Sequence, residues 1–131
     1  MGLKNSKEMW KDMAITAWNH RKNARILGKT KVGAAVLSKG EIFGGCNIEH
    51  KFRSHDIHSE ISAISAMISS GHKKIDAIII VAEKTKFTPC GGCLDWIFEF
   101  GGPLCLVGYQ TKKNGKITIF KAKELMPHYP A

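Results

Sequence analysis

The run Asp76–Ala82, DAIIIVA, decides the fold class of this 131-residue chain. Every residue after the aspartate is apolar, and most of them are β-branched. Such a run is typical of a strand that is buried on both faces and therefore has helices on each side of its sheet. We expect an α/β fold in which this strand is buried in the sheet.

Helical and extended segments alternate on both sides of this strand. Apolar residues recur at helical spacing in two stretches, and Lys39-Gly40 and Asn114-Gly115 are turn signals between strand-like segments. The expected elements, in chain order, are a helix (5–24), two strands (32–38, 41–46), a loop (47–57), a helix (58–71), a strand (76–82), a helix (90–100), two strands (104–109, 116–120) and a helical turn (121–126).

This order predicts one domain, residues 1–131, folded as a three-layer α/β/α sandwich around a five-stranded mixed sheet. No repeat, linker or low-complexity segment divides the sequence. A chain of this length buries about two-thirds of its unfolded surface, so a core forms without disulfides.

The four cysteines fall into two kinds. Cys46 and Cys105 lie in apolar, strand-like segments, where a free cysteine acts as a small hydrophobic residue. Cys90 and Cys93 form a C-x-x-C motif, which in an intracellular protein indicates metal or redox chemistry.

The chain carries 20 Lys and Arg against 11 Asp and Glu, a net charge of +9. This charge attracts polyanions, so a nucleic-acid partner stays open, but the lysines are spread along the chain, which favours a solvated basic surface. The longest apolar run is too short to cross a bilayer, and no signal peptide is recognisable. We expect no membrane partner and a cytoplasmic location.

Two short motifs, His58-Ser59-Glu60 and Pro89–Cys93 (PCGGC), each open a predicted helix. The thiolates of Cys90 and Cys93 with the His58 imidazole would hold zinc and leave its fourth tetrahedral position to water. We expect the helix N-terminus to lower the pKa of both thiols. Glu60 would move protons between the water and a substrate.

Each motif alone has a simpler explanation. A single histidine at a helix start is usually structural, and C-x-x-C occurs in zinc ribbons and redox pairs. No second C-x-x-C completes a ribbon, however, and the start of a thioredoxin-like unit is missing. His55 and His58 form a possible ligand pair, but no acid follows His55 at the catalytic spacing. Both motifs together favour a catalytic zinc centre of His58, Cys90 and Cys93.

The motifs match the H-x-E…P-C-x-x-C signature of zinc deaminases, and almost the whole chain resembles the cytidine deaminase family, blasticidin-type deaminases included. Lys31–Val36 (KVGAAV) is similar to that family's first strand, Gly45–Glu49 (GCNIE) to its G-x-N-x-E segment, and Glu124–Tyr129 (ELMPHY) to its closing E-L-L-P-x-x-F. The resemblance implies a cytidine deaminase-like fold, one Zn²⁺ per chain and a homo-oligomer, either tetramer or dimer.

The resemblance also implies roles for residues beside the metal. Asn47 and Glu49 would bind ribose hydroxyls, the Ser59 N–H would meet the carbonyl oxygen of the base, and the Thr88 carbonyl would hold the departing amino group. Tyr129 would line a neighbouring subunit's site; a place in the core or at its rim is the alternative for this aromatic residue.

Some positions depart from the family's pattern. His58 and Ile61 stand where small family members commonly have Cys and Arg. Three thiolates give the zinc centre a negative charge that an arginine can offset, whereas two thiolates and a neutral imidazole leave it neutral, so the uncharged Ile61 matches the His58 ligand. Thr30, Leu94-Asp95 and His50 replace other residues that relatives use around the base and sugar, so we expect an altered pocket wall.

The sequence thus predicts a zinc-dependent hydrolase of pyrimidine salvage that converts a cytosine-type nucleoside, cytidine, deoxycytidine or a modified analogue, to the uridine-type product and ammonia. Two alternatives remain: a deaminase that acts on a polynucleotide or another aminated heterocycle, and a zinc-stabilised binding module without catalysis. The free carboxylate of Glu60 argues against the binding module, since a structural zinc site has four protein ligands.

Overall fold

The computed structural model describes residues 5–84 and 88–130, and its centre is a five-stranded mixed sheet. The strands lie in the order β2-β1-β3-β4-β5, and among them only β3 and β4 are parallel. This is the predicted sheet. The strands are β1 (Gly33–Ser38), β2 (Glu41–Cys46), β3 (Ala77–Val81), β4 (Leu106–Gln110) and β5 (Ile117–Lys121).

The run that predicted the fold class forms β3, the middle strand, and all five of its residues are buried. Ile78 and Ile80 belong to one core cluster, whereas Ala77, Ile79 and Val81 belong to the other. Alternate side chains of a strand point to opposite faces, so β3 supplies apolar groups to both cores. A continuous apolar run is what this position requires.

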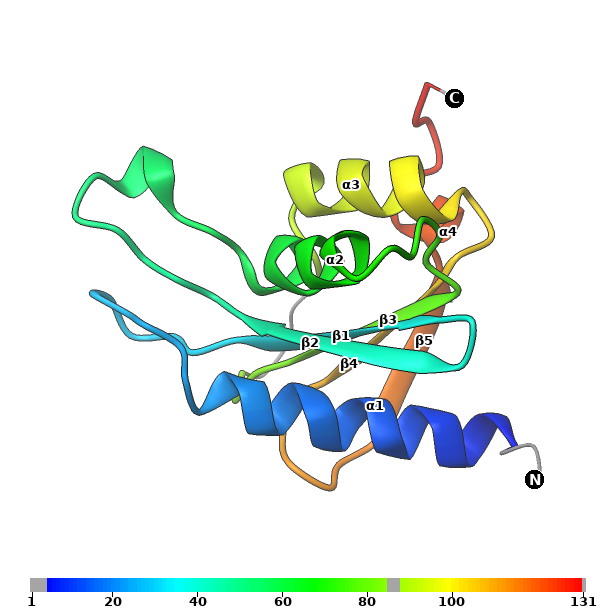
Figure 1. Cartoon of the computed structure of the whole chain (residues 1–131), viewed down its shortest axis with the longest axis horizontal. Coiled ribbons are helices and arrows are strands. Elements are labelled where there is room, and N and C mark those ends of the chain that lie inside the picture. Colours follow the sequence, from blue (N-terminus) through cyan, green and yellow to red (C-terminus); the bar gives the residue numbers. More distant parts are fainter. Residues whose placement is uncertain (1–4, 85–87, 131) are drawn as a thin grey trace.

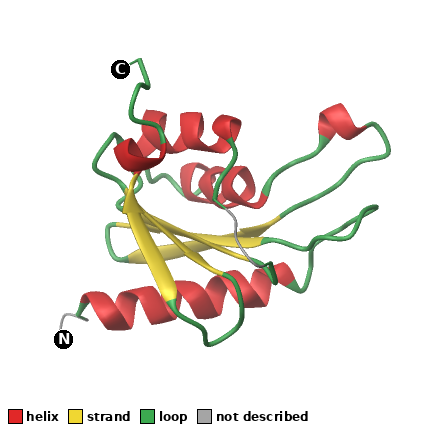
Figure 2. Cartoon of the chain, turned by 180° about the vertical axis from the view of Figure 1, so that it is seen from behind, coloured by secondary structure: helices red, strands yellow, loops and turns green. Residues whose placement is uncertain are grey.

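Helices cover both faces of the sheet, as Figures 1 and 2 show. α1 (Ser6–Arg21) lies on one face, while α2 (Ser59–Ser69), α3 (Gly91–Gly101) and the short α4 (Ala122–Leu125) lie on the other. The predicted three-layer α/β/α sandwich is confirmed. None of the helices in the described parts is long and apolar enough to span a membrane.

The β1–β2 hairpin has the two-residue turn that the sequence indicated. Lys39 and Gly40 both have positive φ, 49° and 81°, between the paired Ser38 and Glu41. At the other end of β2, a Cβ on Gly45 would lie 2.4 Å from the backbone nitrogen of Ala63. Only glycine allows α2 to pack this closely against the sheet.

Two long loops, 22–32 and 47–58, extend together from one end of the sandwich (Figure 1). Backbone bridges join Arg25 to Ile48 and Ile48 to Ile57. The polar loop predicted for 47–57 also contains a 3₁₀ turn at Arg53–His55. We call loops 22–32 and 47–58 together the arm.

Candidate metal centre

The three predicted metal ligands come from the starts of two helices. His58 is the N-cap of α2, and Cys90 is the N-cap of α3, with Cys93 in its first turn. α2 runs antiparallel to the strand that follows it, and α3 leaves the carboxyl end of that same strand, β3. Both helix N-termini therefore meet at one end of β3, where ligand sites of α/β sheets usually lie.

The side chains of these residues converge. The Nδ1 atom of His58 lies 3.3 Å from Cys93 Sγ and 3.4 Å from Cys90 Sγ. The ligand atoms of all three lie within 4.8 Å of one another, and they are the only such group of three or more found in the described chain. Donors around a tetrahedral zinc lie about 3.6 Å apart, given Zn–N of about 2.0 Å and Zn–S of about 2.3 Å. The donor set and its spacing fit zinc.

The Cys93 thiol corrects one expectation. In the metal-free protein, burial raises its pKa well above the ordinary value, and the Glu60 carboxylate raises it further. The predicted lowering by the helix N-terminus is therefore wrong for this cysteine, because desolvation of a thiolate outweighs the helix dipole. Metal binding at Cys93 must release a proton, which makes zinc affinity dependent on pH.

Glu60 lies in the first turn of α2, beside the ligands, and is only 5% exposed. Its Oε1 accepts a hydrogen bond of 2.7 Å from the Ser59 hydroxyl, which is also buried. Glu60 is not in the ligand group. A buried carboxylate that is held by a neighbour and faces three ligands is placed for proton transfer rather than for coordination.

A cavity of about 290 Å³ opens over this centre. It includes all four residues to which the resemblance assigned substrate contacts. Ser59 begins α2, where backbone N–H groups have no partner inside the helix. The full lining is Thr30, Val32, Asn47, Glu49, Arg53, Asp56, Ile57, His58, Ser59, Glu60, Ile80, Lys84, Thr88 and Cys90.

Asn47 forms side-chain hydrogen bonds to the backbone of two other residues of the cavity wall. Its Oδ1 accepts a hydrogen bond from the Val32 N–H at 2.9 Å, and its Nδ2 donates to the Thr30 carbonyl at 3.0 Å. One amide hydrogen and one oxygen lone pair remain for a ligand. Asn47 therefore has a structural role that does not exclude the predicted contact with a sugar.

Glu49 is held by more partners than the sequence suggested. Its Oε1 accepts from the Leu27 and Gly28 N–H groups at 2.6 and 2.8 Å, and its Oε2 lies 3.2 Å from Arg53 Nη2. Arg53 Nε also donates to Asp56 Oδ2 at 2.8 Å. Arg53 thus joins two carboxylates at the mouth of the cavity, and Glu49 links the two loops of the arm.

The titration behaviour of these groups follows from their contacts. The backbone N–H groups of Gly28 and Leu27, and then Arg53, lower the pKa of Glu49. The His50 N–H and then the Arg53 side chain lower the pKa of Asp56. Both carboxylates are ionised at neutral pH.

The altered wall expected from the sequence is partly wrong. Thr30 does line the cavity. Leu94, however, is buried in the helix-side core, and Asp95, which is outside the lining, accepts a hydrogen bond from the Tyr129 hydroxyl. Tyr129 is half-buried and stacks on Phe98, with ring centroids 4.3 Å apart, so it packs against the rim of this core.

The arm contains two further histidines, His50 and His55. His50 and His55 pack against each other, with ring centroids 5.0 Å apart, and both contact the Phe52 ring. In the described chain, His55 is not part of a metal-ligand group. The sequence reasoning missed Asp56 and Lys84 as lining residues. The i,i+3 pair of Arg53 and Asp56 was visible in the sequence, but no local pattern marks Lys84.

Comparisons with known proteins agree with this geometry. Residues 4–109 match the family described as "Cytidine and deoxycytidylate deaminase zinc-binding region". A cytidine deaminase of Sporosarcina psychrophila is 35% identical over 101 residues, which are 76% of this chain and 74% of that protein. A probable cytidine deaminase of Dictyostelium discoideum is 36% identical over 74 residues, but that match spans 54% of this chain and only 50% of the relative.

Comparison with solved structures points to the same family. The crystal structure of cytidine deaminase from Burkholderia pseudomallei superposes with a TM-score of 0.82, covering 90% of this chain and 96% of that one at 26% identity. The family match includes both metal-binding motifs and most of the sheet. The chain therefore belongs to the cytidine and deoxycytidylate deaminase family defined by this zinc-binding region.

Proposed function

We propose that this chain is a zinc-dependent hydrolase that removes the exocyclic amine of a cytosine-type nucleoside. Water replaces the amine, so the products are the uridine-type nucleoside and ammonia. The observation that carries the proposal is the buried Glu60 carboxylate beside a converged His58, Cys90 and Cys93. A purely structural zinc site needs a fourth protein ligand and no such acid.

The residues divide the chemistry among them. Zinc held by His58, Cys90 and Cys93 would supply the Lewis acidity that brings the pKa of a water near about 7. Glu60 takes a proton from the attacking water and passes it to the ring nitrogen of the base. It then takes the second proton of that water, now on the new hydroxyl of the base, and gives it to the amine, which leaves as ammonia while the carbonyl forms. One carboxylate thus serves successive transfers. The Ser59 hydroxyl keeps Glu60 in orientation through these steps.

The substrate contacts proposed here are those that the family resemblance implies, and they are supported by the presence of all four residues in the lining of the cavity. The Ser59 N–H would bind the carbonyl oxygen of the base, and the Thr88 carbonyl would bind the amino group. Asn47 and Glu49 would bind the sugar hydroxyls. The cavity of about 290 Å³ is at the small end of ligand sites, which suits a nucleoside more than a large substrate.

The charges at the mouth favour testing phosphorylated substrates as well. Glu49 alone would repel a 5′-phosphate, but Arg53 lies 3.2 Å from it and offsets its charge. Arg53 is also paired with Asp56, so the cation of the lining that supports phosphate binding is Lys84. Lys84 is the specific support for the second candidate, a deaminase that acts on a nucleotide or a polynucleotide.

A substrate comparison tests both candidates. Cytidine, deoxycytidine, cytosine, CMP and a single-stranded oligonucleotide are compared with the wild type and with Glu49→Ala, and Glu41→Ala on β2 is the control. We expect cytidine or deoxycytidine to exceed cytosine, and Glu49→Ala to lose roughly tenfold in kcat/KM on nucleosides. Equal rates for cytosine and cytidine would show that Asn47 and Glu49 do not bind a sugar. Fastest turnover of the oligonucleotide, falling steeply with salt, would favour the polynucleotide enzyme.

We also propose a homo-oligomer that acts in the cytoplasm. The arm supports self-association, because four of its large apolar side chains are exposed: Leu27, Ile48, Phe52 and Ile57. Phe52 and Leu27, one on each loop of the arm, are 59% and 52% exposed, and such exposed apolar groups mark surfaces that bind a partner. Sedimentation of the wild type and Phe52→Ser should show an oligomer that the substitution weakens. A monomeric wild type at micromolar concentration would contradict the proposal.

A further inference from the structure

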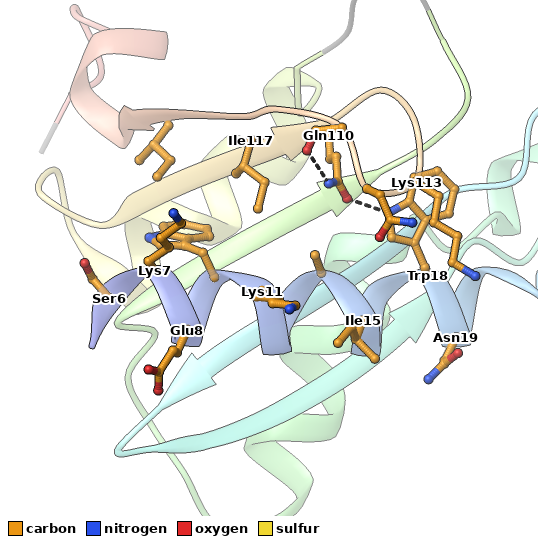
Figure 3. A pocket seen from close by; sticks show the side chains of 15 residues that line it. Ser6, Lys7, Glu8, Lys11, Ile15, Trp18, Asn19, Gln110, Lys113 and Ile117 are labelled. Carbon is orange, nitrogen blue, oxygen red and sulfur yellow. Dashed lines mark hydrogen bonds between the residues drawn. The ribbon is translucent and has the colours of Figure 1, made fainter. Parts of the chain in front are cut away.

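A cavity larger than the one over the metal centre lies apart from it. It is a groove of about 1010 Å³ that runs between α1 and the β4–β5 end of the sheet. Its lining shares no residue with the cavity over the metal. Figure 3 shows the groove along α1, on the face of the sheet opposite to α2 and α3.

The groove exists because one helix covers only part of this face. α1 packs against β1, β2 and β3, but makes no comparable packing with β4 or β5. Ile79 and Val81 face α1, so their partners Gly108 and Gln110, and in turn Ile119 and Ile117 on β5, face the same side. Ile119 is 44% exposed there. In an α/β/α sandwich, this half of the face is where a further helix would lie.

The length of the groove matches a short helix. On this face Trp10 lies against Gly108 and Trp18 bonds to Gln110, so the two indole rings cover β4, and the apolar floor that stays open is formed by Ile117 and Ile119 of β5. The wall follows α1 from Ser6 to Asn19, a length of about 20 Å at 1.5 Å per residue. A partner helix of roughly 13 residues would fill this length.

The polar groups at one end of the groove are already paired. The Trp18 Nε1–H donates to Gln110 Oε1 at 2.6 Å, and Gln110 Nε2 donates to the Gly115 carbonyl at 2.7 Å (Figure 3). An occupant therefore needs no buried polar group at this end. Trp10, Ile15 and Ile117 offer it apolar contact instead.

The charges around the groove decide the chemistry of the occupant. Lys7 and Lys11 lie on the α1 side and Lys113 lies at the far end, all exposed, against the single acid Glu8 (Figure 3). A second copy that docked through its own α1 would bring the same lysines to the contact, and the chain carries a net +9. We propose that this groove binds an amphipathic helix of another protein whose apolar stripe is flanked by Asp and Glu.

The test uses the full chain and designed peptides of roughly 14 residues. One peptide has leucines at helical spacing flanked by glutamates, the second has lysines in place of the glutamates, and the third is a scrambled form of the first. Labelled peptides are titrated with the protein, and fluorescence anisotropy reports binding. We expect the acidic amphipathic peptide to bind roughly tenfold or more tightly than either control peptide.

Two double variants separate the groove from general charge. Lys7→Glu with Lys11→Glu should weaken the acidic peptide roughly tenfold and now favour the lysine peptide. Lys73→Glu with Lys74→Glu makes the same change in net charge, but these two residues lie in the loop between α2 and β3, outside the groove. This variant should still bind the acidic amphipathic peptide more tightly than the lysine peptide. Circular dichroism and zinc content confirm that each variant is folded.

Several results would overturn the proposal. Equal binding of the scrambled and amphipathic acidic peptides would show attraction without a groove, and so would equal weakening by both double variants. If sedimentation showed a dimer whose stability changed with the Lys7 and Lys11 substitutions, the occupant of the groove would be a second copy of this chain. No binding of any peptide at high micromolar concentration would also reject it.

Discussion

Replacement of Glu60 by glutamine removes one negative charge beside the metal ligands and keeps the size of the side chain. Glu60 is 5% exposed, and its Oε1 accepts the Ser59 hydroxyl at 2.7 Å. The amide oxygen of glutamine can accept the same hydrogen bond, so we expect the stability to change by only about 1 kcal/mol. Because the Glu60 charge raises the pKa of Cys93, its removal should ease thiolate formation and retain zinc.

The effect on catalysis should be much larger than the effect on folding. A positioned acid–base group is typically worth about 10²–10⁴ in rate, which equals about 3–5 kcal/mol in the barrier. Glu60 serves several proton transfers in the proposed mechanism, so we expect the loss to fall near the upper value. The loss should appear in kcat, because a group that moves protons acts on the transition state more than on binding.

The assay compares the wild type, Glu60→Gln and a control, Glu99→Gln, at equal protein and with zinc measured in each sample. Glu99 is exposed on α3 and outside the cavity over the metal. Initial rates of ammonia release from cytidine give kcat, and thermal unfolding gives the midpoint. Full activity of Glu60→Gln would refute the acid–base role, and loss of zinc together with activity would make Glu60 a structural residue of the site.

Three further substitutions or conditions test the surroundings of the centre. Arg53→Met should raise KM more than it lowers kcat, since it frees Glu49 and Asp56 at the cavity mouth; steady-state kinetics measures both, and an unchanged KM would contradict the role of this pairing. The pKa values of Glu49 and Asp56 lie below their ordinary values, so their stabilisation is complete above pH of about 5 and is lost as pH falls through the ordinary and then the lower folded values. Backbone N–H groups are the main cause and Arg53 adds to them, so Arg53→Met should shift the acid unfolding midpoint to higher pH; a midpoint equal to the wild type's would reject the contribution of Arg53. Ile61→Arg should reduce activity, because it places a cation beside a centre whose ligands already balance the zinc charge; a rate and a melting temperature equal to the wild type would show that this charge matching has no effect.

Much of the fold could be predicted because it depends on local patterns. The apolar run of β3 indicated a strand with helices on both faces, and Lys39-Gly40 marked a two-residue turn. The uncovered half of the α1 face could not be predicted in this way. It depends on which strands α1 lies over, and that choice is made by packing between segments distant in the sequence.

The candidate site shows the same division. His58, Cys90 and Cys93 were recognisable because metal ligands need particular residue types at particular spacings. The partners of Glu49 were not, because they include backbone N–H groups from another loop. The pKa of Cys93 also depends on burial by the folded chain, which no spacing of residues reveals.

Zinc titration into metal-free protein, with ammonia release from cytidine as the readout, shows whether His58, Cys90 and Cys93 form one zinc site that supports hydrolytic deamination. The rate should rise linearly with added zinc and reach a plateau at about one zinc per chain. No ammonia at any zinc ratio, or a rate independent of zinc, would show that these residues do not form a catalytic zinc centre.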